Sequence, residues 1–291
     1  PEKLAYIKPA TQCESPDLLL RWCEAKGVAY CGGSDAPLVF YSGFTRQFLE
    51  GNQGTSAGWI DEVRKAVEVV SEDKWFVLID GVGFPAVGSV VGVSNAEVAL
   101  ASTAPVVIVG KAGVGGAIDA HTLNATFFNA NHVPVLGGIF NRAATEGFYR
   151  QEVCKENIEA HFRIRRNRER VFGVLPDLLA LADVRESVPD MTTEKALALA
   201  ELNIDHVGTH VDVTSLILEA ALDPWNRRRL PALPSLILTS DQPHVDFTQK
   251  TPNNQESRTK MVERTVVVEQ GTRQSRAQIE AHAKAQGAKG G

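Results

Sequence analysis

Residues 77–85 read VLIDGVGFP, and no other stretch of the chain indicates its fold as directly. With Phe76, the first residues of this stretch form a continuous apolar run, which is typical of a strand buried on both faces of a parallel sheet. Asp80 ends the run, and Gly81 and Gly83 then form a turn. Open α/β sheets bind ligands at the carboxyl ends of their strands, so Asp80 is a candidate magnesium ligand and the glycines allow a ligand to approach the backbone. The alternative is that Asp80 only caps the turn.

Other apolar runs of this kind alternate with segments of helical periodicity. Strands are expected at residues 4–7, 76–79, 105–109, 135–140 and 171–175. Helices are expected at residues 16–25, 57–70, 117–131, 147–162, 192–202 and 213–222. Strands that alternate with helices indicate βαβ units with right-handed crossovers. The predicted fold class is therefore α/β, with a doubly wound and mainly parallel sheet.

Two further segments carry candidate site residues. Lys8 follows the first expected strand, where a lysine can meet the charge of a phosphate or carboxylate, although a solvent-exposed lysine is the more common outcome. The glycine-rich stretch 110–116 is expected to be a flexible turn, because its lysine precedes most of the glycines. The phosphate-loop motif G-x-x-x-x-G-K-[ST] occurs nowhere in the 291 residues. His206 and His210 are four residues apart and resemble metal ligands in their spacing only.

The composition excludes several classes of protein. Hydrophobic residues make up 44% and charged residues 22%, which is typical of globular domains and excludes disordered, collagen-like and disulfide-stapled chains. No window approaches the roughly 20 apolar residues that cross a bilayer. The net charge of −5 argues against a nucleic-acid partner. The four cysteines form no C-x-x-C pair, so we expect reduced thiols and a cytoplasmic location.

Charge is unevenly distributed along the chain. Residues 223–291 hold 11 Lys and Arg and 7 Asp and Glu, which gives them a net charge of +4. Since the whole chain has a net charge of −5, residues 1–222 have a net charge of −9. Five prolines interrupt the basic segment, and no sustained helical or strand pattern persists in it. We therefore expect an α/β domain at residues 1–222 and an extended tail at 223–291. An acidic body with a basic tail favours a protein partner that binds residues 224–291; the alternative is that both parts are simply solvated.

Several segments, taken in their order along the chain, resemble dethiobiotin synthetase and its relatives among the cobyric-acid-synthase-like P-loop proteins. The resemblance spans about residues 3–222. The segments that carry it are Lys-Pro at 8–9, Asp-Gly-Val-Gly at 80–83, the stretch 95–99, the strand at 105–109 with the glycine-led helix at 115–123, Gly-Ile-Phe-Asn at 138–141 and Gly-Val-Leu-Pro at 173–176.

This resemblance implies roles for individual residues. Lys8 would face the carbamate and phosphate of a substrate, and Asp17 and Asp80 would bind magnesium. The residues that would bind the nucleotide are Gly81, Gly83, Asn141, which would read adenine, and Pro176. ATP and Mg²⁺ would be the cofactors of an active member, whereas an inactive one would need none. The resemblance also implies that the body could form a homodimer.

The chain departs from the family's pattern. The family's first strand, its phosphate loop and its first helix should precede Leu4, and without that loop no backbone nest holds the phosphates. Asp80 is one methylene shorter than the family's glutamate, and Phe84 replaces a glycine. Either the polypeptide extends upstream of Pro1, or the chain is a degenerate relative that works through its surfaces. An empty central slot in the sheet would expose two unpaired strand edges, which favours the first explanation.

We hold two hypotheses for the function. The first is a non-catalytic or weakly nucleotide-binding scaffold subunit, which docks through its tail into a larger assembly. The second is an ATP- and magnesium-dependent carboxylase-ligase that closes a cyclic urea, with its phosphate loop upstream of Pro1.

Overall fold

The computed structural model describes residues 2–12, 18–181, 191–223 and 235–240. All of these residues lie in one compact unit, Pro1–Asp246. The second unit, Phe247–Gly291, lies outside the described residues. The expected partner-binding tail therefore falls largely outside them, and so does Asp17.

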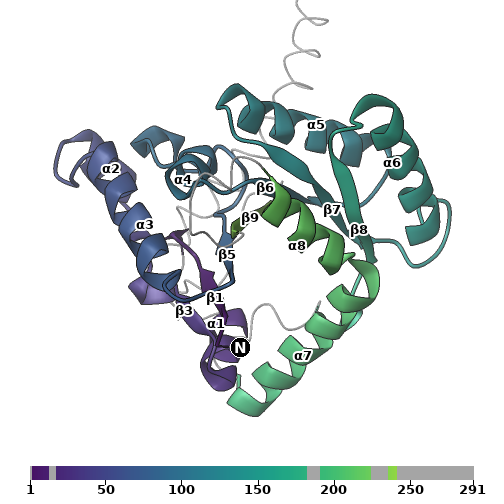
Figure 1. Ribbon diagram of the computed structural model, residues 1–291, viewed down its shortest axis with the longest axis horizontal. Coiled ribbons are helices and arrows are strands. Elements are labelled where there is room, and N and C mark those ends of the chain that lie inside the picture. Colours follow the sequence, from purple (N-terminus) through teal and green to yellow (C-terminus); the bar gives the residue numbers. More distant parts are fainter. Residues whose placement is uncertain (1, 13–17, 182–190, 224–234, 241–291) are drawn as a thin grey trace, which may run out of the picture. The chain divides into compact units, whose positions relative to one another are not determined.

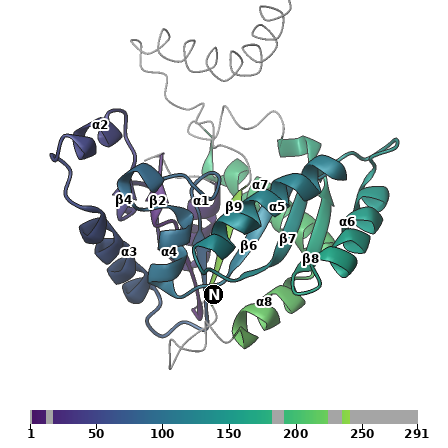
Figure 2. The ribbon, with the colours of Figure 1, turned by 90° about the horizontal axis from the view of Figure 1, so that it is seen from above.

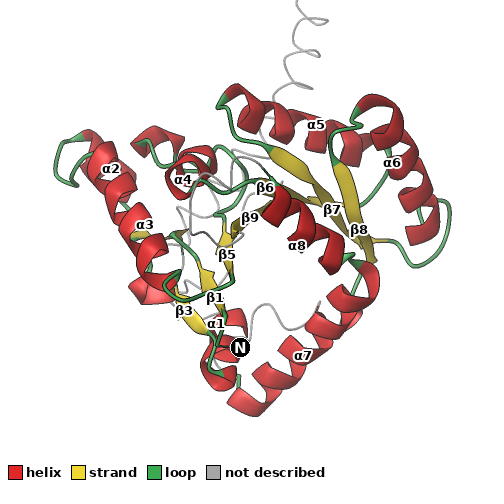
Figure 3. Ribbon diagram, in the orientation of Figure 1, coloured by secondary structure: helices red, strands yellow, loops and turns green. Residues whose placement is uncertain are grey.

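A seven-stranded sheet forms the centre of the described unit (Figures 1 and 3). Its spatial order is β3-β1-β5-β9-β6-β7-β8, and every neighbouring pair is parallel. Its strands are β1 (Leu4–Ile7), β3 (Ala29–Cys31), β5 (Phe76–Asp80), β6 (Val106–Lys111), β7 (Val135–Ala143), β8 (Arg170–Pro176) and β9 (Ser235–Ser240). A separate parallel pair joins β2 (Ala10–Thr11) to β4 (Leu38–Val39). The predicted α/β class with a parallel sheet is confirmed.

Strand β9 occupies the position between β5 and β6 (Figures 1 and 2). Leu238 pairs with Asp80 of β5 on one side and with Val107 of β6 on the other. This differs from the expectation of a sheet without its central strand, because a segment of the expected tail supplies one. Its apolar residues complete the hydrogen bonds of two inner edges that would otherwise be unpaired. A domain boundary at residue 222 stays a prediction, and β9 lies beyond it.

Helices cover both faces of the sheet (Figure 3). Those on one face are α3 (Ser56–Val70), α4 (Asn95–Ser102), α5 (Gly115–Ala130) and α6 (Gln151–Arg165). Those on the other face are α1 (Leu18–Lys26), α7 (Thr193–His210) and α8 (Val213–Leu222). The short helix α2 (Phe44–Leu49) packs through Phe44 into the α3 side, and three single 3₁₀ turns are η1 (Gly33–Asp35), η2 (Ser89–Val91) and η3 (Leu179–Leu181). Helices on both faces confirm the doubly wound arrangement.

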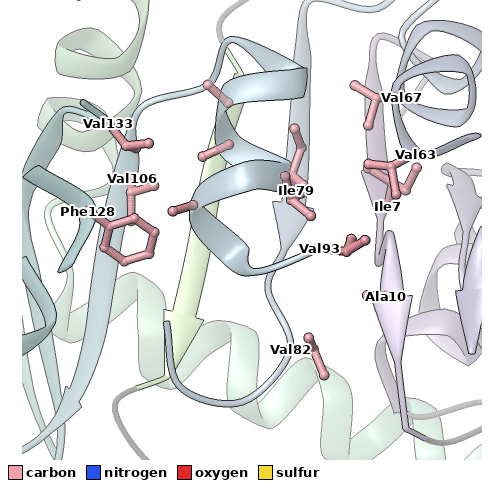
Figure 4. Close-up of a cluster of buried hydrophobic side chains, with 14 of the residues drawn as sticks. Ile7, Ala10, Val63, Val67, Ile79, Val82, Val93, Val106, Phe128 and Val133 are labelled. Atoms are coloured by element: carbon pink, nitrogen blue, oxygen red, sulfur yellow. The ribbon is translucent and has the colours of Figure 1, made fainter. Parts of the chain in front are cut away.

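Alternation along each strand divides the core between the two faces. In β1, Ile7 points into the cluster with Val63 and Val67 of α3, and Ile79 of β5 joins it (Figure 4). Tyr6 points the other way and packs with Leu20 and Cys23 of α1. Successive strand residues face opposite sides, so both faces of β1 and β5 are apolar, as expected for a sheet covered on both sides.

The elements differ from the expected ranges mainly at their ends. Helix α7 runs to His210, eight residues beyond the expected end at residue 202. Helix α4 was not expected, although Ser94 and Glu97 form a capping box at its start. Among the helices of the described residues, none is long and apolar enough to cross a membrane.

Candidate functional site

The carboxyl edge of the main sheet gathers most of the expected site residues. Each comes from a different strand: Lys8 follows β1, the last residues of β5, β6 and β8 are Asp80, Lys111 and Pro176, and Asn141 lies two residues before the end of β7. Because all these strands run parallel, their carboxyl ends meet at one edge. The placement of Lys8, Asp80, Asn141 and Pro176 on this edge agrees with the sequence-based expectation, whereas their roles stay predictions.

Lys8 and Asp80 form an ion pair at this edge. The Lys8 Nζ lies 2.6 Å from Asp80 Oδ2, and the Tyr6 hydroxyl donates to the same oxygen at 2.7 Å. The Lys8 and Asp80 side chains are 17% and 30% exposed, so water screens the pair only in part. Tyr6 was missed in the sequence. Tyr6 lies two residues before Lys8, and this spacing, which places both side chains on the same face of β1, could have indicated it.

The loop after β5 is held by one buried side chain. The Oδ1 of Asn95 accepts from Val82 N at 3.0 Å, and its Nδ2 donates to Val82 O at 3.0 Å and to Phe84 O at 3.1 Å. Asn95 is 2% exposed and opens helix α4. Gly83 is buried in this loop with a φ of +58°, a left-handed conformation that favours glycine. The glycine turn is therefore fixed relative to the end of β5.

Among the described residues Asp80 is the one expected magnesium ligand, and one of its two oxygens is already engaged. Of the two expected ligands, Asp17 lies outside the described residues, and Asp80 already accepts two hydrogen bonds on one oxygen. In the described parts of the chain, no group of three or more His, Cys, Asp or Glu side chains is placed to hold a metal. His206, His210 and Asp212 are among the described residues, and they form no such group.

Asn141 and its neighbour form a second polar group on the same edge. The Asn141 Oδ1 accepts from Arg142 N at 2.8 Å, which leaves its amide nitrogen as the group that can donate to a ligand. Arg142 adopts a φ of +64° and its Nε lies 3.2 Å from Asp177 Oδ1. Asn141 is exposed, so a ligand can reach it.

Pro176 is tied to helix α7 through its carbonyl. The His206 Nε2 lies 3.0 Å from Pro176 O, and the ring of His206 lies 4.8 Å from that of His210. The pKa of His210 is lowered by burial first and then by the charges of His206 and Lys155. His206 therefore connects α7 to the exit of β8, and His210 packs beside it.

The polar residues at the carboxyl edge form two separated groups, the Lys8–Asp80 pair and Asn141 with Arg142. Strands β9 and β6 lie between β5 and β7. Three strand spacings of about 4.8 Å place the Lys8–Asp80 pair roughly 14 Å from Asn141. A ligand that touched both groups would have to extend across the end of β9.

Of the glycine-rich stretch expected to be a turn, residues 112–114 connect β6 to α5, whereas its two ends belong to β6 and α5. Helix α5 begins at Gly115 and has no side-chain cap at Val114. Lys111 is exposed at the end of β6, before these glycines. The turn therefore has none of the lysine and hydroxyl arrangement of a phosphate loop.

A parallel sheet with helices on both faces and polar side chains at its carboxyl edge defines the class of doubly wound nucleotide-binding folds. A family model described as an AAA domain matches residues 35–185, more than half of the chain. The chain belongs to this family, which is a P-loop NTPase family that includes dethiobiotin synthetase-like members. The matched range contains Asp80, Asn141 and Pro176 but not Lys8. No curated protein matches the chain.

Proposed function

We propose that this protein is a non-catalytic or weakly nucleotide-binding scaffold subunit with the P-loop NTPase fold. The observation that carries the proposal is the position of β9 at the centre of the sheet. The residues that follow β9 contain no glycine between 241 and 270, so no glycine-rich phosphate loop leaves this strand. In P-loop proteins the phosphate-binding loop directly follows a strand, and it supplies backbone N–H groups and a lysine to the phosphates.

The absence of such a loop from these 291 residues has a direct chemical consequence. Without several N–H groups converging on the β- and γ-phosphates, transition-state charge on the transferred phosphoryl group is not stabilised. Lys8 remains at the edge as a cation, and Asn141 remains as a hydrogen-bonding group. These residues support weak binding of a nucleotide without phosphoryl transfer.

The proposed scaffold role requires surfaces that bind other protein chains. We propose that the parts of residues 224–291 outside β9 bind a protein partner and that the body could pair with a second copy. The described cysteines Cys23, Cys31 and Cys154 are free thiols, which supports a reducing compartment such as the cytoplasm.

A second candidate is an ATP- and magnesium-dependent ligase of the dethiobiotin synthetase type. It is favoured by the presence of Lys8 and Asp80 on neighbouring strands, with Asn141 on the same edge. This function requires a phosphate loop on a segment before Pro1. The strand of that segment would have to take the position that β9 holds in this structure.

Calorimetric titration with ATP, with and without Mg²⁺, distinguishes the two. For the first proposal we expect weak binding that Mg²⁺ does not strengthen, and no hydrolysis. The test variant is Asp80→Asn, and the matched control is Asp61→Asn on the exposed surface of α3. Magnesium-dependent binding at roughly micromolar affinity, lost in Asp80→Asn but kept in Asp61→Asn, would overturn the first proposal and favour the ligase.

A further inference from the structure

Two side chains at the end of β1 converge on one carboxylate oxygen at the end of the neighbouring strand β5. Tyr6 and Lys8 lie two residues apart on the same face at the end of β1, and β1 is parallel to β5 with Tyr6 opposite Leu78. That register brings Lys8 beside Asp80. The Asp80 Oδ2 receives the Lys8 ammonium at 2.6 Å and the Tyr6 hydroxyl at 2.7 Å.

This arrangement neutralises Asp80 from within the protein. An ionised carboxylate oxygen has two lone-pair positions in the carboxylate plane, and the two donors use the acceptor capacity of Oδ2. The pair is partly shielded from water, because the Lys8 side chain is only 17% exposed and the Tyr6 residue 3%. A charge-assisted contact in such surroundings is stronger than the same contact on an open surface.

A divalent cation would have to compete with this arrangement. Mg²⁺ and Mn²⁺ bind through carboxylate oxygens and usually require one or two carboxylates together with water or phosphate. An ion bound to Asp80 would lie close to the Lys8 ammonium, and the two positive charges repel each other. Water screens this repulsion only in part, because the Lys8 and Asp80 side chains are partly shielded, and the repulsion disfavours the ion.

We infer that Lys8 is the resident counter-ion of Asp80 and holds the place of a divalent cation at this edge. The carboxylate therefore recruits no divalent cation in the native protein, and an anionic ligand meets a charge-balanced edge. Loss of the lysine charge would convert Asp80 into a metal ligand. This inference concerns cation binding alone, and it does not depend on whether a nucleotide binds.

Mn²⁺ titration followed by electron paramagnetic resonance, on the whole chain without nucleotide, tests the inference. The wild type should bind Mn²⁺ no more tightly than Asp80→Asn, which measures the background from other acidic residues. Lys8→Met should gain a site that is tighter by on the order of tenfold or more, and Lys8→Met with Asp80→Asn should lose it. Lys8→Arg, which keeps the positive charge, should behave as the wild type.

The matched control is Lys26→Met. Lys26 forms an exposed ion pair with Glu201 at 2.7 Å, so this variant changes the net charge equally at another place. A gain in Lys26→Met equal to that in Lys8→Met would overturn the inference, because net charge alone would explain it. No gain in a folded Lys8→Met or Lys8→Gln would also overturn it.

The wild type gives a test that requires no folded Lys8 variant. If the wild type binds Mn²⁺ severalfold more tightly than Asp80→Asn, Asp80 already recruits the cation and the inference is wrong. Nucleotide binding plays no part in these measurements, so a failure of the proposed function and a failure of this inference remain distinguishable.

Discussion

Asn95 shows how much a single side chain controls at the residue scale. It is buried and exchanges three hydrogen bonds with the loop after β5, so it fixes the turn that contains Gly81 and Gly83. Its neighbours Ser94 and Glu97 hold the start of α4 through their capping box. The loop and the helix therefore share one anchor.

We expect Asn95→Ala to lower the free energy of unfolding by about 2–3 kcal/mol, because the buried backbone groups of Val82 lose their partner. Urea unfolding followed by circular dichroism measures the change. The control is Asn157→Ala, an exposed residue that bonds only to Val153 O in its own helix, for which we expect less than about 0.5 kcal/mol. Equal losses in both variants would show that Asn95 is not an anchor.

The sequence predicted where Lys8 and Asp80 lie, since both follow short apolar strands. It could not predict that they pair, because pairing depends on β1 and β5 being neighbours in a particular register. Tyr6 was missed for the same reason. Its hydroxyl becomes informative only once Asp80 is known to lie opposite.

At the scale of elements, a buried polar network joins α5 to the start of β8. The His121 Nε2 lies 2.7 Å from Glu169 Oε2, and Arg166 donates to Glu169 Oε1 at 2.5 Å. The His121 ring packs against Gly138 of β7, where an added Cβ would approach it to 3.0 Å. Glycine at this position therefore gives the ring its space.

This network makes stability depend on pH. Burial raises the pKa of Glu169, but hydrogen bonds and positive charge from His121 and Arg166 outweigh it, so the pKa is lowered. A folded-state pKa below the unfolded value of about 4.3 stabilises the protein above that pH, and this stabilisation is lost as the pH falls through the folded-state pKa.

We expect Glu169→Gln to be less stable than the wild type by about 1–3 kcal/mol at pH 7, with a smaller difference below pH 4. Urea unfolding at the two pH values measures both differences. In the control, Glu219→Gln, an exposed pair with Arg170 is removed, and the expected change is below about 1 kcal/mol. A Glu169→Gln difference that stays constant with pH would contradict the role given to this carboxylate.

Elements were predictable where the pattern was long or continuous. The strands at residues 4–7 and 76–79 and the helix at 213–222 agree with β1, β5 and α8 almost residue by residue. For β9 the sequence indicated only a short ordered piece at residues 236–238, because a short apolar run between prolines gives no sign of which strands it joins. Its position depends on the sheet as a whole, because the inner edges of β5 and β6 both need a strand to pair with.

At the scale of the whole molecule, the fold depends on a strand far from its partners in sequence. Val77 of β5 pairs with Ser235 of β9, which lies 158 residues later in the chain. The doubly wound class followed from the alternation of strands and helices. The origin of the central strand did not follow, because it requires a non-local contact.

We expect the chain truncated after residue 246 to fold and the chain truncated after residue 222 to fail. The shorter chain lacks β9 and leaves the inner edges of β5 and β6 unpaired, which promotes aggregation. Thermal unfolding and size-exclusion chromatography measure the difference. If residues 1–222 melted as cooperatively as residues 1–246, β9 would not be required for the sheet.

The position of β9 also determines when the sheet can close during synthesis of the chain. The strands on one side of it are complete once residue 80 has been made, and those on the other side once residue 176 has been made. At about 5–20 residues per second, the ribosome needs roughly 3–13 s more to reach residue 240. For that time the nascent chain carries two half-sheets with open inner edges, so the sheet closes only after residues 235–240 have been made.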